Sequence, residues 1–526
     1  MVKLVQQYFS ESARKFPNKP AVDTSRKDGE LRKTEEEKMT FSELEEYSNQ
    51  LARYLKGKGI IRGDRVAFMF MKIAAVDAIA SLLAILKADA IYVPIHHSTP
   101  PERVAKIWND AKPKLLICKS YSAKTLRNYA GPGFQFIETD IIKKNGEINK
   151  YSPKPIGYEN RSDGNRSEDT AYIMYTSGST GGPKGVEITH GNIINATDWA
   201  VKEFGINEND RMSQHPPFSF DLSTFDLYCA FKSGATLFPV EESLSLFPAE
   251  LLEFIEDRKL TIWNSVPSVL VYLWNSGLVK PGRLTSLKKI FFNGEAFPTK
   301  FLIDWMKTFP DKEFINMYGP TETTVQCSFY RIPKAPTDLS RFVPIGKAQK
   351  GVEIFAVRED NSIAQVNEVG ELLVGGLGVG KGYWDDEERT QAAFIEFPGK
   401  GRVYRTGDLA RLLPDGNYEF IGRKDNQVKV HGNRIELGDV DVTMYSLPYV
   451  NEAAAIVVPE TETGSNMLIA FVDLKSPQPE TLIKSDLGKL LPPYMIPVKI
   501  IERKLPKTST GKIDRPKLKA EYERCR

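Results

Sequence analysis

A short loop between residues 175 and 185 combines glycine, hydroxyl side chains and a single lysine. It reads Tyr-Thr-Ser-Gly-Ser-Thr-Gly-Gly-Pro-Lys-Gly. Glycine lets the backbone approach a ligand closely, and successive N–H groups then form a concave anion site. The hydroxyls of Thr176, Ser177, Ser179 and Thr180 add hydrogen-bond donors, and Lys184 adds a positive charge. The loop therefore suits a triphosphate.

The sequence of this loop does not match the Walker-type P-loop, the most familiar phosphate-binding loop. That motif places glycine immediately before its lysine and Ser or Thr immediately after it. Lys184 instead follows Pro183 and precedes Gly185. A surface turn rich in small residues stays open as an alternative when the loop is considered alone.

Three further segments carry residue types that suit nucleotide chemistry. Residues 316–324 combine Tyr318, a Gly-Pro turn and Glu322. An aromatic ring can stack on a purine, and a carboxylate can hold Mg²⁺. Asp408 ends the run Tyr-Arg-Thr-Gly-Asp and could bind ribose hydroxyls, while Lys512 lies on a loop of small residues near the C-terminus. Each segment taken alone also fits a solvated turn.

Composition excludes several classes of protein. Lysine and arginine number 71 against 68 aspartates and glutamates, so the charge gives no reason to propose nucleic acid or an anionic membrane as partner. The four cysteines form no CxxC pair, the five histidines form no HExxH motif, and a structural zinc site is not expected. No apolar leader or membrane-length run occurs, so we expect a cytoplasmic protein in a reducing compartment.

Apolar runs and helical patterns alternate along the chain, which predicts parallel α/β layers. Buried strands are expected at 66–71, 91–95 and 115–118, with a helix at 75–88, and a second series follows at 235–240, 260–263 and 288–292. Strands dominate after about residue 340, and residues 426–526 have the size of a small α+β domain. At 526 residues the chain should contain two or more domains.

These motifs, taken together and in order, resemble the adenylate-forming superfamily. The likeness is strongest to stand-alone amino-acid adenylation enzymes, such as prolyl or D-alanyl carrier-protein ligases, which are related to nonribosomal peptide synthetase domains. It runs from about residue 4 to 518 and includes 86–94, where Asp89 and Ala90 stand in place of the usual glycines. Several nucleotide-related motifs in the correct order carry more weight than any one of them.

The resemblance implies a fold and a set of roles. A large N-terminal α/β domain with parallel-type sheets and a β-rich subdomain would span 1–424, and a mobile α+β lid would span 425–526, with Asp425 as the hinge. ATP and Mg²⁺ are implied, with Glu322 as the magnesium ligand, and Lys512, Glu322 and Thr176 as the catalytic residues. ATP or AMP would contact Thr176, Ser177, Gly178, Ser179, Thr180, Gly181, Lys184, Asn293, Gly294, Glu295, Met317, Tyr318, Gly319, Thr321, Asp408, Arg423 and Lys512.

A second set of positions implies an amino acid as substrate. In family members that activate amino acids, the acid equivalent to Asp221 binds the α-ammonium, and Phe220 is an aromatic gate. An ion pair with a substrate is a strong reason to bury a carboxylate, although a helix N-cap is the simpler role for Asp221. The side-chain pocket carried over by the resemblance comprises Leu222, Phe225, Asn264, Phe291, Asn293, Met317, Val325 and Gln326.

This pocket is compact and largely apolar. The segments 220–226 and 292–298 resemble those of free-standing prolyl or D-alanyl carrier-protein ligases, and of the two substrates we expect L-proline. D-alanine or another small or polar amino acid is the alternative, because three amide side chains in the pocket need partners. An acyl-CoA ligase and a non-catalytic nucleotide-binding relative fit less well. The chain ends soon after Lys512, so we expect the acyl acceptor to be a separate carrier protein with a phosphopantetheine thiol.

Overall fold

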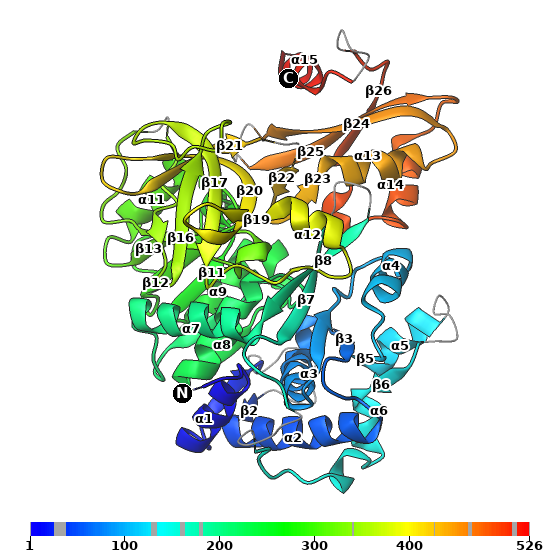
Figure 1. Ribbon diagram of the computed structural model, residues 1–526, viewed down its shortest axis with the longest axis vertical. Helices are drawn as coiled ribbons and strands as arrows, with labels where there is room; N and C mark the ends of the chain where they lie inside the picture. Colours follow the sequence, from blue (N-terminus) through cyan, green and yellow to red (C-terminus); the bar gives the residue numbers. More distant parts are fainter. Residues whose placement is uncertain are drawn as a thin grey trace.

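The computed structural model describes residues 2–25, 38–127, 134–157, 164–177, 182–338, 341–424, 427–460, 465–507 and 513–524. A large N-terminal part contains three sheets, and a smaller C-terminal part, coloured orange to red, lies against one end of it (Figure 1). The predicted hinge residue, Asp425, lies outside the described residues.

The first sheet has seven strands in the order β18-β8-β7-β4-β3-β5-β6. The five strands from β7 to β6 in this order run parallel, and β8 and β18 are added antiparallel at the β7 edge. The strands are β3 (Arg65–Met69), β4 (Ile91–Pro94), β5 (Leu115–Cys118), β6 (Phe136–Glu138), β7 (Thr170–Ser177), β8 (Pro183–Thr189) and β18 (Gly382–Tyr383). The associated helices are α2 (Phe41–Gly57), α3 (Ala75–Lys87), α4 (Pro101–Ala111), α5 (Ser120–Arg127) and α6 (Thr139–Lys144).

The second sheet has nine strands in the order β15-β14-β13-β12-β11-β9-β10-β1-β2, with a parallel centre. They are β1 (Pro20–Asp23), β2 (Lys38–Thr40), β9 (Arg211–Gln214), β10 (Thr236–Pro239), β11 (Ile262–Ser265), β12 (Lys289–Asn293), β13 (Glu313–Tyr318), β14 (Ser328–Arg331) and β15 (Lys347–Ala348). Its helices are α1 (Gln7–Lys15), α7 (His190–Phe204), α8 (Leu222–Ser233), α9 (Pro248–Asp257), α10 (Pro267–Asn275) and α11 (Thr299–Thr308).

Helix α3 shows why the two large sheets pack as layers. Every residue from Ala75 to Lys87 is buried and most of them are apolar, so this helix lies inside the molecule. Its one long polar side chain is Lys87. The Lys87 Nζ group pairs with Glu45 of α2 at 2.7 Å and donates a hydrogen bond to Asn49 Oδ1 at 2.8 Å. Helix α2 begins at a capping box, with Thr40 and Glu43 bonded reciprocally.

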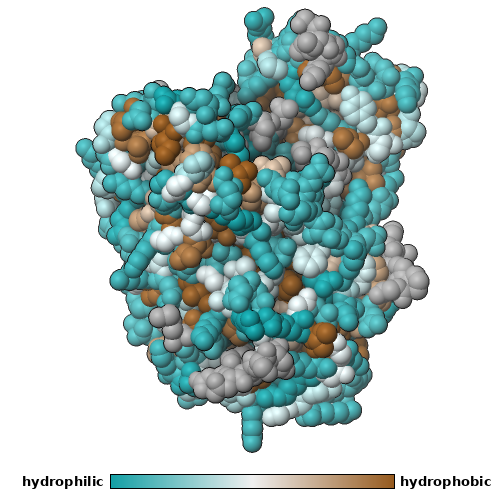
Figure 2. Space-filling model, in the orientation of Figure 1, coloured by the Kyte–Doolittle hydropathy of each residue, from teal (hydrophilic) through white to brown (hydrophobic). Residues whose placement is uncertain are grey.

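A third, antiparallel sheet carries the rest of the N-terminal part, as the strand-rich sequence after residue 340 predicted. Its strands are β16 (Val352–Val357), β17 (Val369–Gly376), β19 (Phe394–Phe397), β20 (Gly401–Leu412) and β21 (Tyr418–Arg423), with α12 (Glu387–Ala393) beside them. Figure 2 shows a mostly hydrophilic face, with one group of hydrophobic residues at upper left, over this sheet.

The C-terminal part is α+β. A hairpin, β22 (Gln427–Val430) and β23 (Asn433–Glu436), precedes a three-stranded sheet of β24 (Val450–Pro459), β25 (Asn466–Leu474) and β26 (Lys499–Glu502). Helices α13 (Leu437–Tyr445), α14 (Glu480–Gly488) and α15 (Arg515–Arg524) cover it. The mixed α/β class and the large and small parts agree with the sequence-based expectation, and the fold places β22 and β23 toward the N-terminal part (Figure 1).

Candidate active site

The glycine-rich loop connects two strands of an antiparallel hairpin. β7 ends at Ser177 and β8 begins at Pro183, and these two residues face each other in the ladder. Gly178, Ser179, Thr180 and Gly181 lie outside the described residues. Thr176 is described, and its buried Oγ1 has no hydrogen-bond partner among the described residues, so it is available to a ligand.

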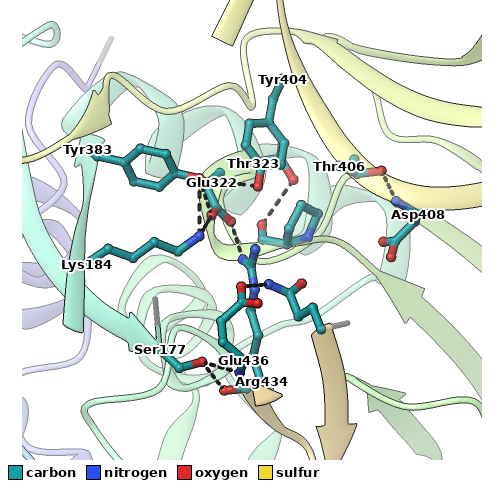
Figure 3. Close-up of polar contacts among 12 residues, drawn as sticks. Ser177, Lys184, Glu322, Thr323, Tyr383, Tyr404, Thr406, Asp408, Arg434 and Glu436 are labelled. Atoms are coloured by element: carbon teal, nitrogen blue, oxygen red, sulfur yellow. Dashed lines mark hydrogen bonds and ion pairs between the residues drawn. The ribbon is translucent and has the colours of Figure 1, made fainter. Parts of the chain in front are cut away.

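Glu322 lies at the centre of a charged cluster (Figure 3). Its side chain is fully buried on η4 (Thr321–Thr323) and accepts from Tyr383 at 2.8 Å. Lys184 Nζ lies 3.2 Å from Oε1, and Arg434 Nη1 lies 2.6 Å from Oε2. Burial by itself would raise the pKa of Glu322, but the charges of Arg434 and Lys184 outweigh it and hold that pKa far below its ordinary value.

This cluster determines how Glu322 could hold Mg²⁺. Magnesium commonly uses one or two protein carboxylates and takes its other ligands from phosphates and water, so a single glutamate is a fitting donor set. Arg434 already neutralises one oxygen of that glutamate. The donor set therefore fits magnesium only where Arg434 does not occupy that oxygen.

Asp408 lies on β20, in a second polar group. It accepts a hydrogen bond from the Tyr318 hydroxyl, and Arg423 Nη1 lies 2.7 Å from its Oδ1. Its own backbone N–H donates to Thr406 Oγ1 at 3.0 Å. Tyr318 itself packs with Cys327 and other apolar residues, and burial and Asp408 raise the pKa of its hydroxyl.

A cavity of about 300 Å³ is lined by Asp408 and Arg423 and by Arg434 of the Glu322 cluster, while Glu322 and Lys184 are not among its described lining residues. Asn293 ends β12 and Tyr318 ends β13, so the cavity lies at the carboxyl edge of parallel strands, where α/β proteins bind ligands. Of the residues predicted from the sequence, it is lined by Phe220, Asp221, Leu222, Asn293, Gly294, Gly319, Thr321, Val325, Asp408 and Arg423. Tyr318, the predicted adenine contact, is absent from the residues that line it within the described ranges.

Asp221 lies at the start of α8 without acting as its cap. It occupies the N-cap position, but its side chain makes no capping hydrogen bond. Burial raises the pKa of this carboxyl above its ordinary 3.8, partly offset by a hydrogen bond from Thr321 and the charge of Lys429. The structure therefore does not support the capping role, and it leaves a carboxyl group in the cavity wall.

The predicted side-chain pocket is closely packed. All of its members are buried, with exposed fractions from 0% to 9%: Leu222, Phe225, Asn264, Phe291, Asn293, Met317, Val325 and Gln326. Asn264 Nδ2 donates to Asp226 Oδ1 at 2.9 Å, and Asn293 Nδ2 to the Val325 carbonyl at 3.4 Å. Gln326 Oε1 is buried without a partner among the described residues, so it is the polar atom of this set that a ligand could use.

Asp226 was not selected by the sequence analysis. It is fully buried, and burial raises the pKa of its carboxyl well above the ordinary value despite the hydrogen bond from Asn264. Asp221 and Asp226 thus lie five positions apart along α8 in different surroundings. Burial therefore disfavours the charged form of Asp226, and one of its oxygens accepts from Asn264.

The C-terminal part closes the cavity with the β22–β23 hairpin. Lys429, His431, Gly432 and Arg434 all line it. Gly432 N–H donates to Glu295 Oε1 at 2.6 Å. Gly432 has φ +76°, and a Cβ atom there would lie 2.2 Å from a methyl of Val266, so only glycine fits this approach.

Two further contacts fix this docking. The Ser177 hydroxyl donates to the Arg434 carbonyl at 2.7 Å and accepts from Glu436 N–H at 3.1 Å (Figure 3). Arg103 of α4 pairs with Asp439 of α13 at 3.3 Å, and both side chains are buried. Lys512, the predicted catalytic lysine, lies outside the described residues. Helix α15, which follows it in the chain, lies at the end of the C-terminal part farthest from the N-terminal part (Figure 1).

The sequence analysis did not identify Arg434, Tyr383 or Lys429 as site residues. A signal for Arg434 was present, because His-Gly-Asn between two alternating runs is typical of a β-hairpin, whose turn brings the flanking strands together. Tyr383 reaches Glu322 through β18, a two-residue strand that pairs with β8. Such a short strand has no periodic pattern by which it could be predicted.

Two family models match this chain. The AMP-binding enzyme model covers residues 9–384, and the AMP-binding enzyme C-terminal domain model covers residues 439–512. The chain belongs to the AMP-binding enzyme family and is an ATP-dependent, adenylate-forming ligase. Among the described residues, no helix combines the length and apolar character needed to cross a membrane.

Relatives of known activity cover nearly the whole chain. It is 32% identical to an L-proline--[L-prolyl-carrier protein] ligase of Pseudomonas fluorescens, over 99% of this chain and 100% of that protein. It is 33% identical to gramicidin S synthase 1 of Brevibacillus brevis, over 98% of this chain but 44% of that protein. The Vibrio cholerae adenylation domain AlmE, solved with glycyl-adenosine-5'-phosphate, has the same fold, with a TM-score of 0.84 at 24% identity, over 99% of this chain and 98% of that one.

Proposed function

We propose that this chain activates L-proline with ATP and transfers it to the phosphopantetheine thiol of a separate carrier protein. In the first step a carboxylate oxygen of the amino acid attacks the α-phosphorus of ATP, and pyrophosphate leaves. In the second step the thiol sulfur attacks the carbonyl carbon of the aminoacyl-AMP, its proton is lost, and AMP leaves. Neither step needs a side-chain nucleophile.

The observation that carries this proposal is Asp221. Its carboxyl group lines the cavity, makes no capping bond, and has a pKa raised by burial. A substrate ammonium would give this carboxyl an ion-pair partner in addition to the hydrogen bond from Thr321, and pairing would favour its charged form. The full-length similarity to a prolyl-carrier protein ligase supports proline as the amino acid. The packed, mostly apolar residues of the side-chain pocket support a small ring.

The nucleotide would occupy the part of the cavity near Asp408. Asp408 would accept from the ribose hydroxyls, and Arg423, paired with it at 2.7 Å, holds it in place. Thr176 and Lys184 would bind the phosphates, since Thr176 Oγ1 is free of partners in the described chain. Mg²⁺ bound with ATP would offset phosphate charge, with Glu322 as its protein ligand.

In this proposal, adenylate formation and thioester formation take place with the C-terminal part in two different positions. In the structure the β22–β23 hairpin faces the cavity, and Arg434 holds Glu322. We assign this arrangement to the thioester step, because it leaves Glu322 without room for magnesium. Rotation about Asp425 would withdraw Arg434 and bring Lys512 to the adenylate.

A second cavity supports entry of the thiol in this arrangement. It measures about 110 Å³ and shares Phe220, Asp221 and Thr321 with the larger cavity. Its wall also includes Tyr494, from the C-terminal part. A flexible pantetheine arm of a carrier protein could pass between the two parts here and meet the activated carbonyl.

Amino-acid-dependent exchange of pyrophosphate into ATP tests the first step, and mass spectrometry of a phosphopantetheinylated carrier protein tests the second. Exchange with L-proline followed by prolyl-thioester formation supports the proposal. Nucleotide binding without exchange for any amino acid would instead make the chain a non-catalytic relative. Exchange best supported by a polar amino acid would assign its side chain to Gln326, whose Oε1 is buried without a partner in the described chain.

A further inference from the structure

His96, His97 and Glu242 form a compact cluster at the rim of the larger cavity. His96 Nε2 lies 3.2 Å from Glu242 Oε1, and His97 Nε2 lies 3.2 Å from Oε2. The two imidazole rings lie side by side, with centroids 4.5 Å apart. Each of the three residues offers one ligand atom, and these atoms all lie within 4.8 Å of one another.

The cluster joins the two large sheets. His96 and His97 follow β4 of the seven-stranded sheet, which ends at Pro94, and Glu242 follows β10 of the nine-stranded sheet, which ends at Pro239. All three side chains are partly exposed, at 23%, 21% and 40%. An ion could therefore reach them from solvent, and His96 also lines both cavities.

The spacing of the cluster matches a tetrahedral metal ion. Zinc binds imidazole nitrogen and carboxylate oxygen at about 2.0–2.2 Å, so two ligands at a tetrahedral angle lie roughly 3.4 Å apart. Each imidazole Nε2 lies 3.2 Å from a different oxygen of Glu242, close to that separation. Two histidines and a glutamate also form a known zinc ligand set, which leaves one position for water.

Imidazole nitrogen and carboxylate oxygen are both ligand types that zinc accepts. His96 Nδ1 lies 2.7 Å from Ser98 Oγ. If Nδ1–H donates a hydrogen bond to this hydroxyl, Nε2 carries no proton and can bind a metal.

The nearest other basic groups do not compete for the position. Burial lowers the pKa of Lys72 to about 7, so its positive charge is reduced at neutral pH, and its Nζ is bonded to the carbonyls of Gln214 and Pro216. His215 Nε2 is bonded to Ser245 Oγ at 3.1 Å, and burial lowers the pKa of His215 to about 3. His215 is thus neutral and already partnered.

We propose that His96, His97 and Glu242 bind a zinc-class divalent cation that links the two sheets at the rim of the active-site cavity. This site is separate from the magnesium that would accompany ATP at Glu322. Sequence spacing rules do not detect it, because its ligands are two adjacent histidines and an acid from a different sheet rather than an HExxH or CxxC motif. The competing arrangement is a metal-free cluster in which both Nε2–H groups donate to Glu242, and in which Ser98 N–H donates to His96 Nδ1 at 3.2 Å.

The test is zinc titration of the chelator-treated, full-length chain by calorimetry, with Co²⁺ absorption as a second readout. We expect one zinc per chain, the intense visible bands of tetrahedral Co²⁺, and a higher melting temperature with zinc. His97→Ala and Glu242→Gln should each weaken binding by more than the roughly tenfold to hundredfold that outer-shell partners contribute. Glu241→Gln is the matched control, because it removes one negative charge at the adjacent position and should retain wild-type affinity.

Two results would overturn the proposal. One is the absence of stoichiometric zinc binding by the wild-type chain. The other is equal zinc affinity in wild type, His97→Ala and Glu242→Gln. If a variant fails to fold, zinc X-ray absorption of the wild-type chain decides the question: nitrogen and oxygen ligands with two imidazoles support the site, and sulfur ligands contradict it.

Discussion

Arg434 and Glu322 form an ion pair across the boundary between the C-terminal and N-terminal parts, with Nη1 2.6 Å from Oε2. Glu322 is fully buried, and burial opposes its charge, so the pair depends on the neighbouring cations. The charge of Glu322 raises the pKa of Arg434 well above its ordinary value despite burial. This pair connects the position of the C-terminal part to the residue that would hold magnesium.

Arg434→Met should separate the two half-reactions. Loss of one partner from a buried pair costs about 3 kcal/mol, so the docked arrangement should be populated far less. We expect thioester formation to fall by about a hundredfold, while pyrophosphate exchange stays within a few fold of wild type. The measurement is each half-reaction assayed separately.

Arg515→Met is the matched control for that experiment. Arg515 pairs with Asp441 inside the C-terminal part, away from the cavity. It should lower stability without changing the ratio of the two half-reactions. Equal loss of exchange and thioester formation in Arg434→Met would contradict the role assigned to the cross-boundary pair.

Substitution by asparagine should lower activity at Asp221 but have little effect at Asp226. Asp221→Asn removes the charge that would pair with the α-ammonium, which should cost about 3 kcal/mol and lower exchange by roughly a hundredfold or more. Burial disfavours the charged form of Asp226, and Asp226→Asn keeps an oxygen that can accept from Asn264, so exchange should be nearly unchanged. ATP binding should survive in both. Full activity in Asp221→Asn would remove the main support for an amino-acid substrate.

Acid pH should weaken amino-acid binding through Asp221. Burial raises the pKa of this carboxyl above 3.8, and its protonated form cannot pair with an ammonium. As pH falls through the raised pKa, the carboxylate is lost and KM for the amino acid should rise. KM for ATP over the same range is the internal control. An amino-acid KM that stays flat while the enzyme remains folded would contradict the pairing.

Lys512 and Asp425 should affect different steps, if the C-terminal part alternates between two positions. Lys512→Ala should nearly stop adenylate formation and largely spare transfer from supplied aminoacyl-AMP to a carrier thiol. Asp425→Pro should do the reverse, because proline fixes φ at the proposed hinge while the adenylation position stays accessible. If both variants lose both half-reactions equally, the alternation is wrong.

Periodic patterns were sufficient for the elements that form the layers. The expected strands at 66–71 and 288–292 correspond to β3 and β12, and the expected helix at 75–88 corresponds to α3. These segments are apolar on both faces because they lie inside parallel layers, so the pattern and the packing have the same cause. Boundaries differed by one or two residues.

Partners across long sequence distances could not be predicted in the same way. Arg434 reaches Glu322 over 112 positions, and Asn264 donates to Asp226 rather than to a substrate. The family resemblance points to Glu322 and Asn264 as site residues, but their partners depend on how sheets and domains meet. The zinc-class cluster has the same origin, since Glu242 is 145 positions from His97 and the two join only in the folded chain.

The central claim is best tested by pyrophosphate exchange with L-proline and with cyclopentanecarboxylate, which has the same ring and carboxyl group but no amine. D-alanine and L-glutamine complete the panel. The account predicts strong exchange with L-proline, much weaker exchange with D-alanine and L-glutamine, and almost none with cyclopentanecarboxylate. Equal exchange with L-proline and cyclopentanecarboxylate would contradict the role of Asp221, and preference for D-alanine would contradict the substrate.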